Sequence, residues 1–434
     1  MSLYKPYPAY KDSGIEWIGR VPDHWDIARI KRTAQIATDR CNVIPAGSPY
    51  IGLEDVESGS GQYKPTTTTS RHSEDSTVGL FRAGDVLYGK LRPYLRKCIT
   101  GPTDGACSTE FLVLKPASVS PAWLQNWLLT HDVTQQIEAG CDGAKMPRAD
   151  WEHVGSIHIP IPEKTEQDFI LAALDRETAR IDALIAKKTR FIELLKEKRQ
   201  ALITHAVTKG LDPNVKMKDS GVEWIGKVPE HWERRKISHA FARIGSGTTP
   251  PSDQPGWYSD DGIPWITTGE LRENEITRTT KYVTQRALGQ FSTLRVYPKG
   301  SLAIAMYGAT IGRLGILGIS ATTNQACCVL SDGKSMTIRF VYYWLLVSKR
   351  QIIEIFAAGG GQPNINQEII SSLRVPSPSI DKQDAIAAFL DRETTRIDSL
   401  IAKTQRSIDL LKERRAAFTT AAVTGQIDLR GETA

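Results

Sequence analysis

A direct repeat constrains this chain more than any other feature of its sequence. The segment Lys11–Gly19 returns almost unchanged as Lys218–Gly226, 207 positions later. The match continues through Val21–Trp25 and Val228–Trp232. A repeat of this length organises a whole fold, so it has to be interpreted before any single motif. It predicts that the chain contains two copies of one framework.

A second repeated segment lies further along each copy. Leu174–Thr178 returns as Leu390–Thr394, and here the offset is 216 positions. The change of offset from 207 to 216 implies nine additional residues early in the second copy. We expect them in the stretch Gly245–Gly262, which is rich in Gly, Pro and Ser and is typical of a surface loop.

The repeated arms and helices differ from the blocks between them. The arms and helices are near copies, whereas the blocks share spaced residues, such as Gly84 with Gly300, but few side chains. Gene duplication followed by drift would explain two copies. Drift alone should not spare the arms and helices while it scrambles the blocks. One framework that carries two different recognition surfaces explains the pattern better.

Helical periodicity extends from Gln167 to about Thr208, and the second copy repeats it. Pro162 before this segment and Gly210 after it are typical start and stop signals. About 40 residues at ~1.5 Å each predict a rod of ~60 Å. The apolar residues that we expect at the seam between two such helices are Leu174, Ile181, Ile185, Ile192, Leu195, Leu390, Ile397, Ile401, Ile408 and Leu411.

A long amphipathic helix needs a partner, and the sister helix has a seam that matches position for position. We therefore predict an antiparallel coiled-coil pair. The polar Lys188 and Thr404 stand in the middle of the seam, where register-setting residues often lie. The alternative is that each helix packs on its own domain.

The blocks between the arms and the helices have the pattern of mixed α/β domains. Apolar runs at Pro49–Leu53 and Asp85–Tyr88 predict buried strands, and their counterparts are Pro264–Thr268 and Ser301–Ile304. Helical spacing also predicts helices over Trp123–Ile137 and Phe340–Ile355.

The predicted fold class is therefore α/β, of the mixed α+β kind, with an internal pseudo-twofold. Two recognition domains are separated by two long antiparallel helices. The expected segments are 1–165 for the first domain with its arm, 166–210 for the central helix, 211–380 for the second domain with the repeated arm, and 381–434 for the C-terminal helix and tail.

Composition excludes several classes of protein. The formal net charge of +6 is mildly basic and is compatible with a polyanionic partner. Six cysteines without a CxxC motif or regular spacing favour a reducing cytoplasm over a disulfide framework or a zinc site. The first ten residues lack an apolar core, so we expect no signal peptide. The apolar stretch Leu302–Ile319 is interrupted by Arg313 and four glycines and predicts buried strands.

Catalytic motifs are mostly absent. Gly333–Ser335 has the ending of a Walker A loop, but Cys328 stands where the first glycine belongs. There is no HExxH motif, no EF-hand loop and no amino-methyltransferase tetrapeptide. The chain is therefore expected to hold neither a metal ion nor a catalytic centre.

Basic, aromatic and glycine-rich turns are present instead, at matching offsets in the two blocks. Arg and Lys reach phosphates or guanine edges, and Asn and Gln pair with adenine. A solvated loop is the alternative for each turn taken alone. The candidate DNA contacts are Tyr88, Lys90, Arg92, Tyr94, Arg96, Lys145, Arg148, Thr267, Thr268, Tyr307, Thr310, Arg313, Gln362, Asn364 and Asn366.

These motifs resemble those of the specificity subunits of type I restriction–modification systems. The resemblance covers essentially the whole chain, and its most specific parts are the repeated arm and the repeated helix segment. The turns Met306–Thr310 and Gly361–Ile365 also follow the family pattern. Thr165–Gln167 fits the usual helix entry, from which Asp381–Gln383 departs in the second copy.

The resemblance implies a non-catalytic subunit that binds double-stranded DNA. Each recognition domain would bind one half of a split target, and the two helices would hold the domains apart and carry two methyltransferase subunits. Restriction subunits with translocase activity would complete the assembly. S-adenosylmethionine, ATP and Mg would then bind the partner subunits, and this chain would hold no cofactor.

Two alternatives stay open at this point. The same architecture occurs in specificity subunits or domains of other modification systems, such as Type IIB enzymes. A free-standing nuclease is the third hypothesis, with acidic residues such as Glu54 and Asp55 as metal ligands, although no proline–aspartate nuclease pattern surrounds them.

Overall fold

The structure, a computed structural model, describes residues 4–44, 47–66, 77–141, 143, 145–223, 225–253, 255–356 and 364–430. The chain divides into two compact units. The first consists of Met1–Thr189 and Gln405–Ala434, and the second is Arg190–Thr404. Each long helix therefore contributes one half to each unit. The division into four segments, which treats the helices separately, stays a prediction.

The first unit contains two four-stranded sheets and two smaller strand pairs. One sheet has the order β4 (Ala34–Ile36), β11 (Phe111–Pro116), β8 (Val86–Gly89) and β9 (Cys98–Thr100), and all its pairings are antiparallel. The other has the order β5 (Arg40–Cys41), β7 (Val78–Phe81), β10 (Gly105–Cys107) and β6 (Tyr50–Ile51), with β6 parallel to β10. The smaller pairs are β1 (Tyr10–Asp12) with β2 (Arg20–Pro22), and β3 (Asp26–Arg29) with β12 (His158–Ile161).

Short helices cover the first unit, and tryptophans fill its core. The helices are α1 (Ile30–Thr33), α2 (Pro121–Leu128), α3 (His131–Ala139) and α4 (Trp151–Ser156). Trp25, Trp123 and Trp127 are fully or almost fully buried, and the rings of Trp25 and Trp123 meet edge to face at 5.6 Å between centroids. Such aromatic contacts dominate the energetics of a core of this size.

The second unit has the same plan, with one sheet larger by one strand. A five-stranded sheet has the order β16 (Phe241–Ser246), β24 (Cys327–Gly333), β21 (Leu302–Ala305), β22 (Leu314–Leu317) and β19 (Asn274–Ile276). A four-stranded sheet has the order β17 (Tyr258–Ser259), β20 (Tyr282–Val283), β18 (Ile263–Ile266) and β23 (Thr322–Thr323), with β18 parallel to β23. The smaller pairs are β13 (Met217–Asp219) with β14 (Lys227–Pro229), and β15 (Glu233–Lys236) with β25 (Arg374–Ser377).

The helices of the second unit are α6 (Ile237–Ala240), α7 (Gln285–Gln290), α8 (Ile338–Phe356) and α9 (Gln367–Ser372). Helix α8 buries Phe340 and Trp344 in the core beside Trp232. The strands predicted from the apolar runs are confirmed as β6, β8, β18 and β21, and α8 confirms the helix predicted over Phe340–Ile355. The apolar stretch after Ser301 forms β21 and β22, as expected.

One predicted helix is wrong in its extent. The segment Trp123–Ile137 forms two helices, α2 and α3, instead of one. Thr130 lies between them in extended conformation, with φ −69° and ψ 152°, and its hydroxyl donates to the carbonyl of Trp127. Apolar spacing continues across this break because both helices bury a face, so periodicity alone does not reveal the turn.

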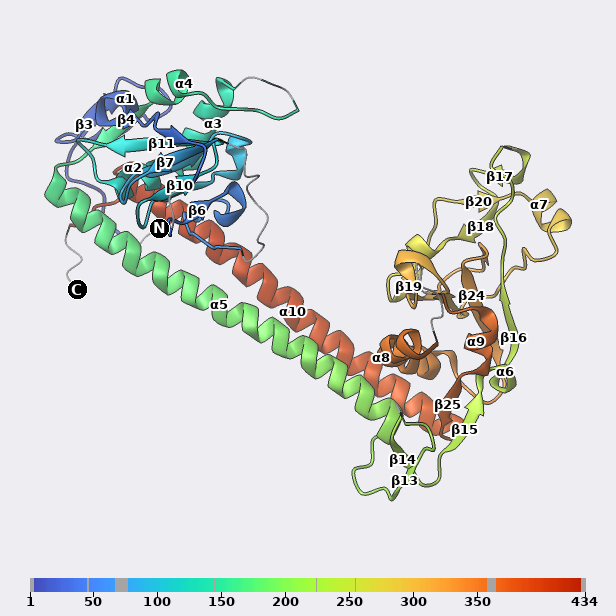
Figure 1. Ribbon diagram of the computed structural model, residues 1–434. Helices are drawn as coiled ribbons and strands as arrows, with labels where there is room; N and C mark the ends of the chain where they lie inside the picture. Colours follow the sequence, from blue (N-terminus) through green and yellow to red (C-terminus); the bar gives the residue numbers. More distant parts are fainter. Residues whose placement is uncertain are drawn as a thin grey trace. The chain divides into compact units, whose positions relative to one another are not determined.

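The long helices α5 (Lys164–Lys209) and α10 (Ile380–Val423) run side by side (Figure 1). In the first unit the start of α5, with Ile170 and Leu174, shares a core with the end of α10, with Phe418 and Ala422. In the second unit Ile203 near the end of α5 shares a core with the start of α10. The pair is therefore antiparallel, as predicted.

The predicted seam is buried along both helices. Leu174, Ile181, Ile192 and Leu195 on α5 are buried, and Ile185 is half-buried. On α10, Leu390, Ile397 and Ile408 are buried. Ile401 and Leu411 on the same helix are half-buried. Both ends of each helix also pack on a domain core, so the coiled-coil pairing and the alternative of domain packing coexist.

Two equivalent ion pairs connect the helices. Nε of Arg415 lies 3.1 Å from Oδ1 of Asp182 in the first unit, and Nε of Arg199 lies 3.1 Å from Oδ1 of Asp398 in the second. The two arginines, like the two aspartates, are 216 positions apart in the sequence. The pairs are thus the same interaction made twice, which only an antiparallel register of equivalent helices allows.

The repeated arms occupy equivalent places at the helix ends. Gly210 follows α5 at φ +79° and approaches the ring of Trp232, while Gly425 follows α10 at φ +73° and approaches Pro22 and Trp25. The segment before the first arm closes the same end of the first unit. Lys5 forms a β-bridge with Asp428, and the Tyr10 hydroxyl donates to the Gly425 carbonyl at 3.1 Å. The segment before the first arm therefore packs against the segment that follows α10.

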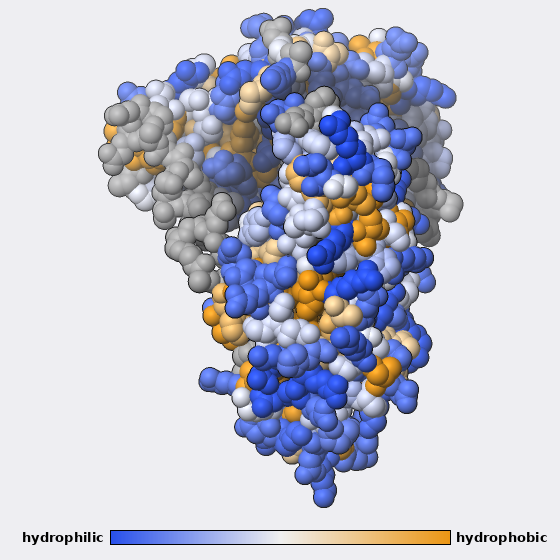
Figure 2. All heavy atoms as spheres, turned by 90° about the vertical axis from the view of Figure 1, so that its right-hand side faces the viewer, coloured by the Kyte–Doolittle hydropathy of each residue, from blue (hydrophilic) through white to orange (hydrophobic). Residues whose placement is uncertain are grey.

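Among the described residues, no helix is both long enough and apolar enough to cross a bilayer. The face drawn in Figure 2 is mostly hydrophilic, and its apolar patches are small and separate.

A circularly permuted chain tests the equivalence of the two helix ends. We expect a variant with its original ends joined by a short flexible linker, and new ends at Pro213, to unfold at a temperature close to that of the parent chain. Pro213 is exposed and lies between α5 and β13, so the new ends interrupt no paired strand. Thermal unfolding followed by circular dichroism is the measurement.

The matched control is a permutant opened inside β8, which pairs with two neighbouring strands. That control should not fold. Failure of the Pro213 permutant to fold, with a linker long enough to join Tyr4 and Arg430, would contradict the equivalence of the two ends.

Candidate nucleic-acid interface

Two turns that are far apart in the sequence lie together in the first unit. The turn Lys90–Lys97 connects β8 to β9 and includes a short 3-10 helix, Pro93–Leu95. Leu91 forms an isolated antiparallel bridge with Arg148, and the Arg92 amide donates to the Pro147 carbonyl at 2.9 Å. The backbone thus brings Leu91 and Arg92 of the first turn beside Pro147 and Arg148 of the second.

The second unit repeats this frame with different side chains. Tyr307 forms the corresponding bridge with Asn364, and the Ile365 amide donates to the Met306 carbonyl at 2.8 Å. In the first unit the Ala149 amide donates to the Lys90 carbonyl in the same way, also at 2.8 Å. The predicted turns of each block are therefore brought together by equivalent hydrogen bonds.

The backbone of the two turns also shares two left-handed positions. Gly308 and Gly312 adopt φ +75° and +73° in the second unit, as glycine does without steric cost. In the first unit Arg92 and Arg96 hold the equivalent positions at φ +54° and +47°. A side chain in this region costs roughly 1–2 kcal/mol per residue. Strain of this kind is concentrated at functional sites.

An acidic residue modifies the charge of the first surface. Nη2 of Arg148 contacts both carboxylate oxygens of Glu110, at 2.7 and 2.8 Å. Partial burial lowers the pKa of Lys90, and the nearby Arg148 and Arg40 lower it further, whereas Glu110 opposes the shift. Sequence reasoning missed Glu110 and Arg40, because neither belongs to the turns or to any motif.

Two cations of the first surface make no side-chain contact that pairs them with another described residue. Arg92 and Lys145 are exposed, and Tyr94 keeps 49% of its surface exposed. Within the described part of the chain, neither cation makes a side-chain hydrogen bond or ion pair. Unpaired Arg and Lys on a folded turn are suited to phosphate oxygens and guanine edges.

The prediction of a DNA contact is wrong for Tyr88. Its side chain is fully buried in the first core, because strand β8 is covered on both faces. Burial raises the pKa of the Tyr88 phenol well above its ordinary value. The apolar run Val86–Tyr88 is typical of a strand that is buried on both faces. Tyr88, at the end of this run, therefore does not reach the surface of the turn.

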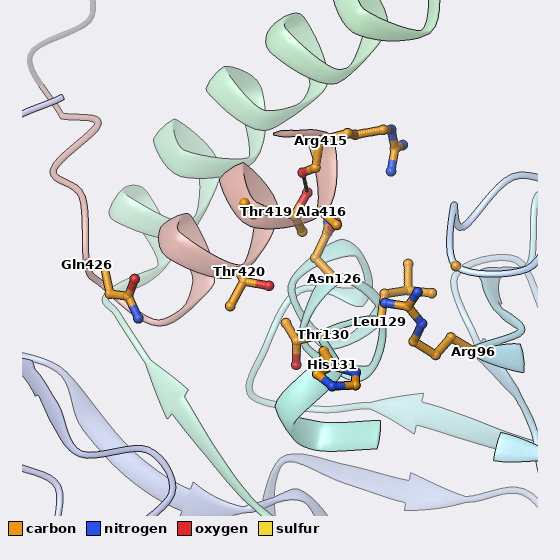
Figure 3. A pocket seen from close by; sticks show the side chains of 12 residues that line it. Arg96, Asn126, Leu129, Thr130, His131, Arg415, Ala416, Thr419, Thr420 and Gln426 are labelled. Atoms are coloured by element: carbon orange, nitrogen blue, oxygen red, sulfur yellow. Dashed lines mark hydrogen bonds between the residues drawn. The ribbon is translucent and has the colours of Figure 1, made fainter. Parts of the chain in front are cut away.

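Arg96 lies on the wall of a pocket in the first unit (Figure 3). The pocket has a volume of about 280 Å³ and lies between the α2–α3 turn and the end of α10. Thr130, His131 and Thr420 also line it. Arg415 borders the same pocket, but its guanidinium pairs with Asp182 and donates to the Ser60 carbonyl.

In the second unit the turn after β21 holds three of the predicted residues. Tyr307 and Thr310 are half-buried, and Arg313 is exposed. The Arg313 guanidinium makes no hydrogen bond or ion pair with the residues that the structure describes. The Thr310 hydroxyl lies 3.5 Å from the Tyr307 carbonyl, within the turn itself.

The remaining predicted residues have mixed positions. Thr267 uses its amide and hydroxyl to contact Glu270, at 2.9 and 3.3 Å, and half-buried Thr268 begins the 3-10 helix Thr268–Glu270. Asn366 caps α9 by accepting from the Ile369 amide at 2.8 Å, which is a structural role. Asn364 is exposed beside Tyr307. Gln362 lies outside the described residues.

The described residues contain no cluster of three or more His, Cys, Asp or Glu side chains that could hold a metal ion. The site geometry is instead that of a surface: two equivalent backbone frames, each presenting its own polar side chains.

Comparison with known proteins identifies the class. Residues 229–409 match the family model of the Type I restriction modification DNA specificity domain. The resemblance inferred from the sequence is thereby confirmed. The relatives are named specificity subunits, which are the non-catalytic recognition components of restriction–modification complexes, so the prediction that this chain is not itself an enzyme is also confirmed.

The individual relatives are distant in sequence. The putative type I restriction enzyme MjaX specificity subunit of Methanocaldococcus jannaschii is 23% identical, over 95% of this chain and 96% of that one. The MjaIX specificity subunit of the same organism is 26% identical, over 44% of this chain and 43% of its own length. The EcoR124I/EcoR124II specificity subunit of Escherichia coli is 21% identical, over 59% and 60% of the two chains.

Solved structures share the fold. A chain from a study of complex assembly and conformational transition of the type I R-M system aligns with a TM-score of 0.73 and 17% identity, over 95% of this chain and 99% of that one. The HsdS subunit from Thermoanaerobacter tengcongensis aligns with a TM-score of 0.55 and 18% identity, over 94% and 98%. These likenesses confirm the mixed α/β fold with two long helices.

Arg92→Gly separates the strain of the turn from its function. We expect the melting temperature to stay unchanged or rise, because glycine removes a steric cost of ~1–2 kcal/mol and loses ~0.5–1 kcal/mol of backbone entropy. Affinity for duplex DNA should fall and its salt dependence should become shallower, because one cation is lost. Thermal unfolding and fluorescence anisotropy at several salt concentrations measure the two effects.

Arg92→Lys is the matched control, since it keeps both the charge and the left-handed side chain. It should leave stability and salt dependence close to those of the parent chain. A glycine variant that is no less stable and binds DNA with the parent's affinity and salt dependence would show that Arg92 has no role in binding.

Proposed function

We propose that this chain recognises a bipartite double-stranded DNA target, with one unit for each half, as the specificity subunit of a type I restriction–modification complex. The observation that carries the proposal is the pair of equivalent turn frames, Leu91 bridged to Arg148 and Tyr307 bridged to Asn364. An equivalent backbone hydrogen bond, from Ala149 to Lys90 and from Ile365 to Met306, supports different side chains in the two units. A shared frame with different side chains is what two different half-sites require.

The chemistry of each frame supports a nucleic-acid partner. The first frame presents the exposed Arg92 and Lys145, whose side chains suit phosphates or guanine. The second presents Arg313 and Asn364, and the amide of Asn364 suits adenine. Phosphate contacts position such a surface, whereas contacts to base edges determine the sequence that it prefers. The two half-sites should therefore differ.

The outer faces of the long helices support docking of two copies of one partner. Leu184 and Leu194 on α5 are 41% and 46% exposed, and their repeat equivalents Leu400 and Leu410 on α10 are 38% and 58% exposed. Exposed apolar side chains at matching repeat positions provide two similar surfaces. We assign these surfaces to two methyltransferase subunits, with restriction subunits completing the complex.

The coenzymes belong to those partners in this proposal. S-adenosylmethionine would serve the methyltransferase subunits, and ATP with Mg would serve the restriction subunits. The expected role of the chain is thus recognition and assembly, inside the compartment where the DNA lies, which is the cytoplasm.

An exchange of one block tests the proposed division of recognition. We expect a chain whose residues from Ile27 to Pro162 come from a relative with another target to direct methylation to a sequence changed in one half only. The physical reason is that both turns of the first frame lie inside this block. Sequencing that detects methylated adenine, in cells that also express the methyltransferase subunit, gives the target.

The reciprocal exchange of the second block is the control and should change the other half. A change in both halves from either single exchange, with folding intact, would count against independent recognition. Methylation or cleavage of DNA by the purified chain alone, with S-adenosylmethionine or magnesium, would contradict its proposed role as a non-catalytic subunit.

Shortening both helices by one heptad tests whether they set the spacing of the half-sites. The matched deletions are Ala186–Ile192 and Ala402–Ile408, which lie between the two ion pairs along each helix. Each deletion shortens its helix by ~10 Å. We expect the same two half-sites with a shorter spacer in the methylation motif.

The double deletion keeps Arg199 with Asp398 and Arg415 with Asp182, because both helices lose the same number of residues between these positions. Deletion in one helix alone moves one pair out of register and should destabilise the chain. An unchanged spacer in the stable double deletion would refute the role of the helices as a ruler.

A further inference from the structure

A small apolar hollow lies at the end of α5 in the second unit. Its volume is about 190 Å³, and its apolar wall includes Leu211, Val215, Trp232 and Ile386. Lys209, His231 and Lys382 supply polar atoms to the same lining. The DNA-recognition surfaces do not include any of these residues.

The repeat places an equivalent hollow in the first unit, and there it is filled. His24, Trp25 and Glu166 stand where His231, Trp232 and Lys382 stand in the second unit. Tyr7 occupies the space with only 3% of its surface exposed. Its ring meets the Trp25 ring edge to face at 5.7 Å between centroids, and its hydroxyl donates to Oε1 of Glu166 at 2.9 Å.

The connections that lead into the two arms explain the difference. In the first unit the segment before the arm supplies Tyr7, and Arg430 from beyond α10 stacks over the Tyr7 ring at 4.7 Å. In the second unit six residues, Leu211–Lys216, connect Gly210 to β13. By the offset of the arms, exposed Asn214 stands in the place of Tyr7. Among the described residues, no side chain fills the second hollow as Tyr7 fills the first.

The charge at the polar end of the hollow is also reversed. Glu166 accepts a hydrogen bond from the Tyr7 hydroxyl, whereas its equivalent Lys382 is a cation whose Nζ donates to Nε2 of His231 at 3.0 Å. A second hollow of about 190 Å³, which shares Lys209, Asp212 and Val215 with the first, adds His205 and Lys227. Asp212 is the one acidic residue among the described residues that line the two hollows.

We propose that the second hollow is a docking slot for an aromatic side chain flanked by acidic residues, on a segment of a partner protein. The aromatic ring takes the place that Tyr7 takes in the first unit, against Trp232. The flanking carboxylates meet the ammonium groups of Lys382 and Lys209. The proposal stands apart from DNA recognition, because every residue that it uses lies outside the turn surfaces.

Short peptides test the proposal on the full-length protein. The probes are three acetylated and amidated tripeptides, Asp-Tyr-Asp, Lys-Tyr-Lys and Asp-Ala-Asp, with binding followed by saturation-transfer NMR and by titration calorimetry. We expect Asp-Tyr-Asp to bind several-fold more tightly than either of the others. Equal binding of Asp-Ala-Asp would reduce the site to a cationic surface and overturn the slot, as would no binding by any peptide.

Two variants locate the binding. Asn214→Tyr restores the tyrosine of the first unit and should abolish binding of Asp-Tyr-Asp by filling the slot, whereas Asn214→Ser, which adds no ring, should retain it. Lys382→Glu restores the acid of the first unit and should reverse the preference toward Lys-Tyr-Lys. Each variant is first shown to unfold at the parent's temperature.

The alternatives are distinguishable in the same experiments. Binding that persists in a folded Asn214→Tyr variant, or a charge preference that survives Lys382→Glu, would place the peptide elsewhere and overturn the proposal. Displacement of the peptide by duplex DNA would assign the cationic rim to nucleic acid and would overturn it as well. DNA binding through the turns is unaffected by either result.

Discussion

The antiparallel contact between α5 and α10 is the interaction on which the rest of the structure depends. Its buried seam and its two ion pairs, Arg415 with Asp182 and Arg199 with Asp398, give both ends of the helix pair the same local structure. Each end then accepts one arm and one recognition block. The first pair is the more buried, and it is tied to the block through Gln62, whose amide donates to Asp182 at 2.9 Å. In the first unit, the contact that sets the register of the two helices therefore also positions the recognition block on them.

A shared backbone explains how two surfaces can diverge without loss of the fold. The bridges and backbone hydrogen bonds of the turns involve main-chain atoms, so they tolerate exchange of side chains. The left-handed positions show the limit of this tolerance. Gly308 and Gly312 fit them freely, whereas Arg92 and Arg96 adopt them at a steric cost that the surrounding strands sustain.

The sequence predicted the periodic parts of this structure well and the local parts poorly. Repeat offsets and seam spacing predicted the helix pair, because burial along a helix is periodic. The break at Thr130 was missed, because apolar spacing continues through it. Tyr88 was misassigned, since a strand covered on both faces is recognised from its neighbours in space, and the same holds for the helix cap that Asn366 forms. Glu110 carries no motif, yet it neutralises Arg148. The ion pairs could have been found, since both their arginines and their aspartates recur at the offset of 216.

The repeated histidines show how one framework acquires two different ends. His24 faces the carboxylate of Glu166, at 2.8 Å from Nε2, so this nitrogen carries a proton and donates. His231 faces the ammonium of Lys382, which has no acceptor, so its Nε2 is unprotonated and accepts. A single exchange of Glu for Lys thus reverses the hydrogen-bonding role of an unchanged histidine.

In the first unit the carboxylate also accepts from Tyr7, and the chain's own segment closes the end. In the second unit the ammonium leaves the polar end of an equivalent hollow with the opposite charge. Conservation of the arm and divergence of the helix start therefore act together, and the two ends of the helix pair are equivalent in fold but not in the chemistry they present.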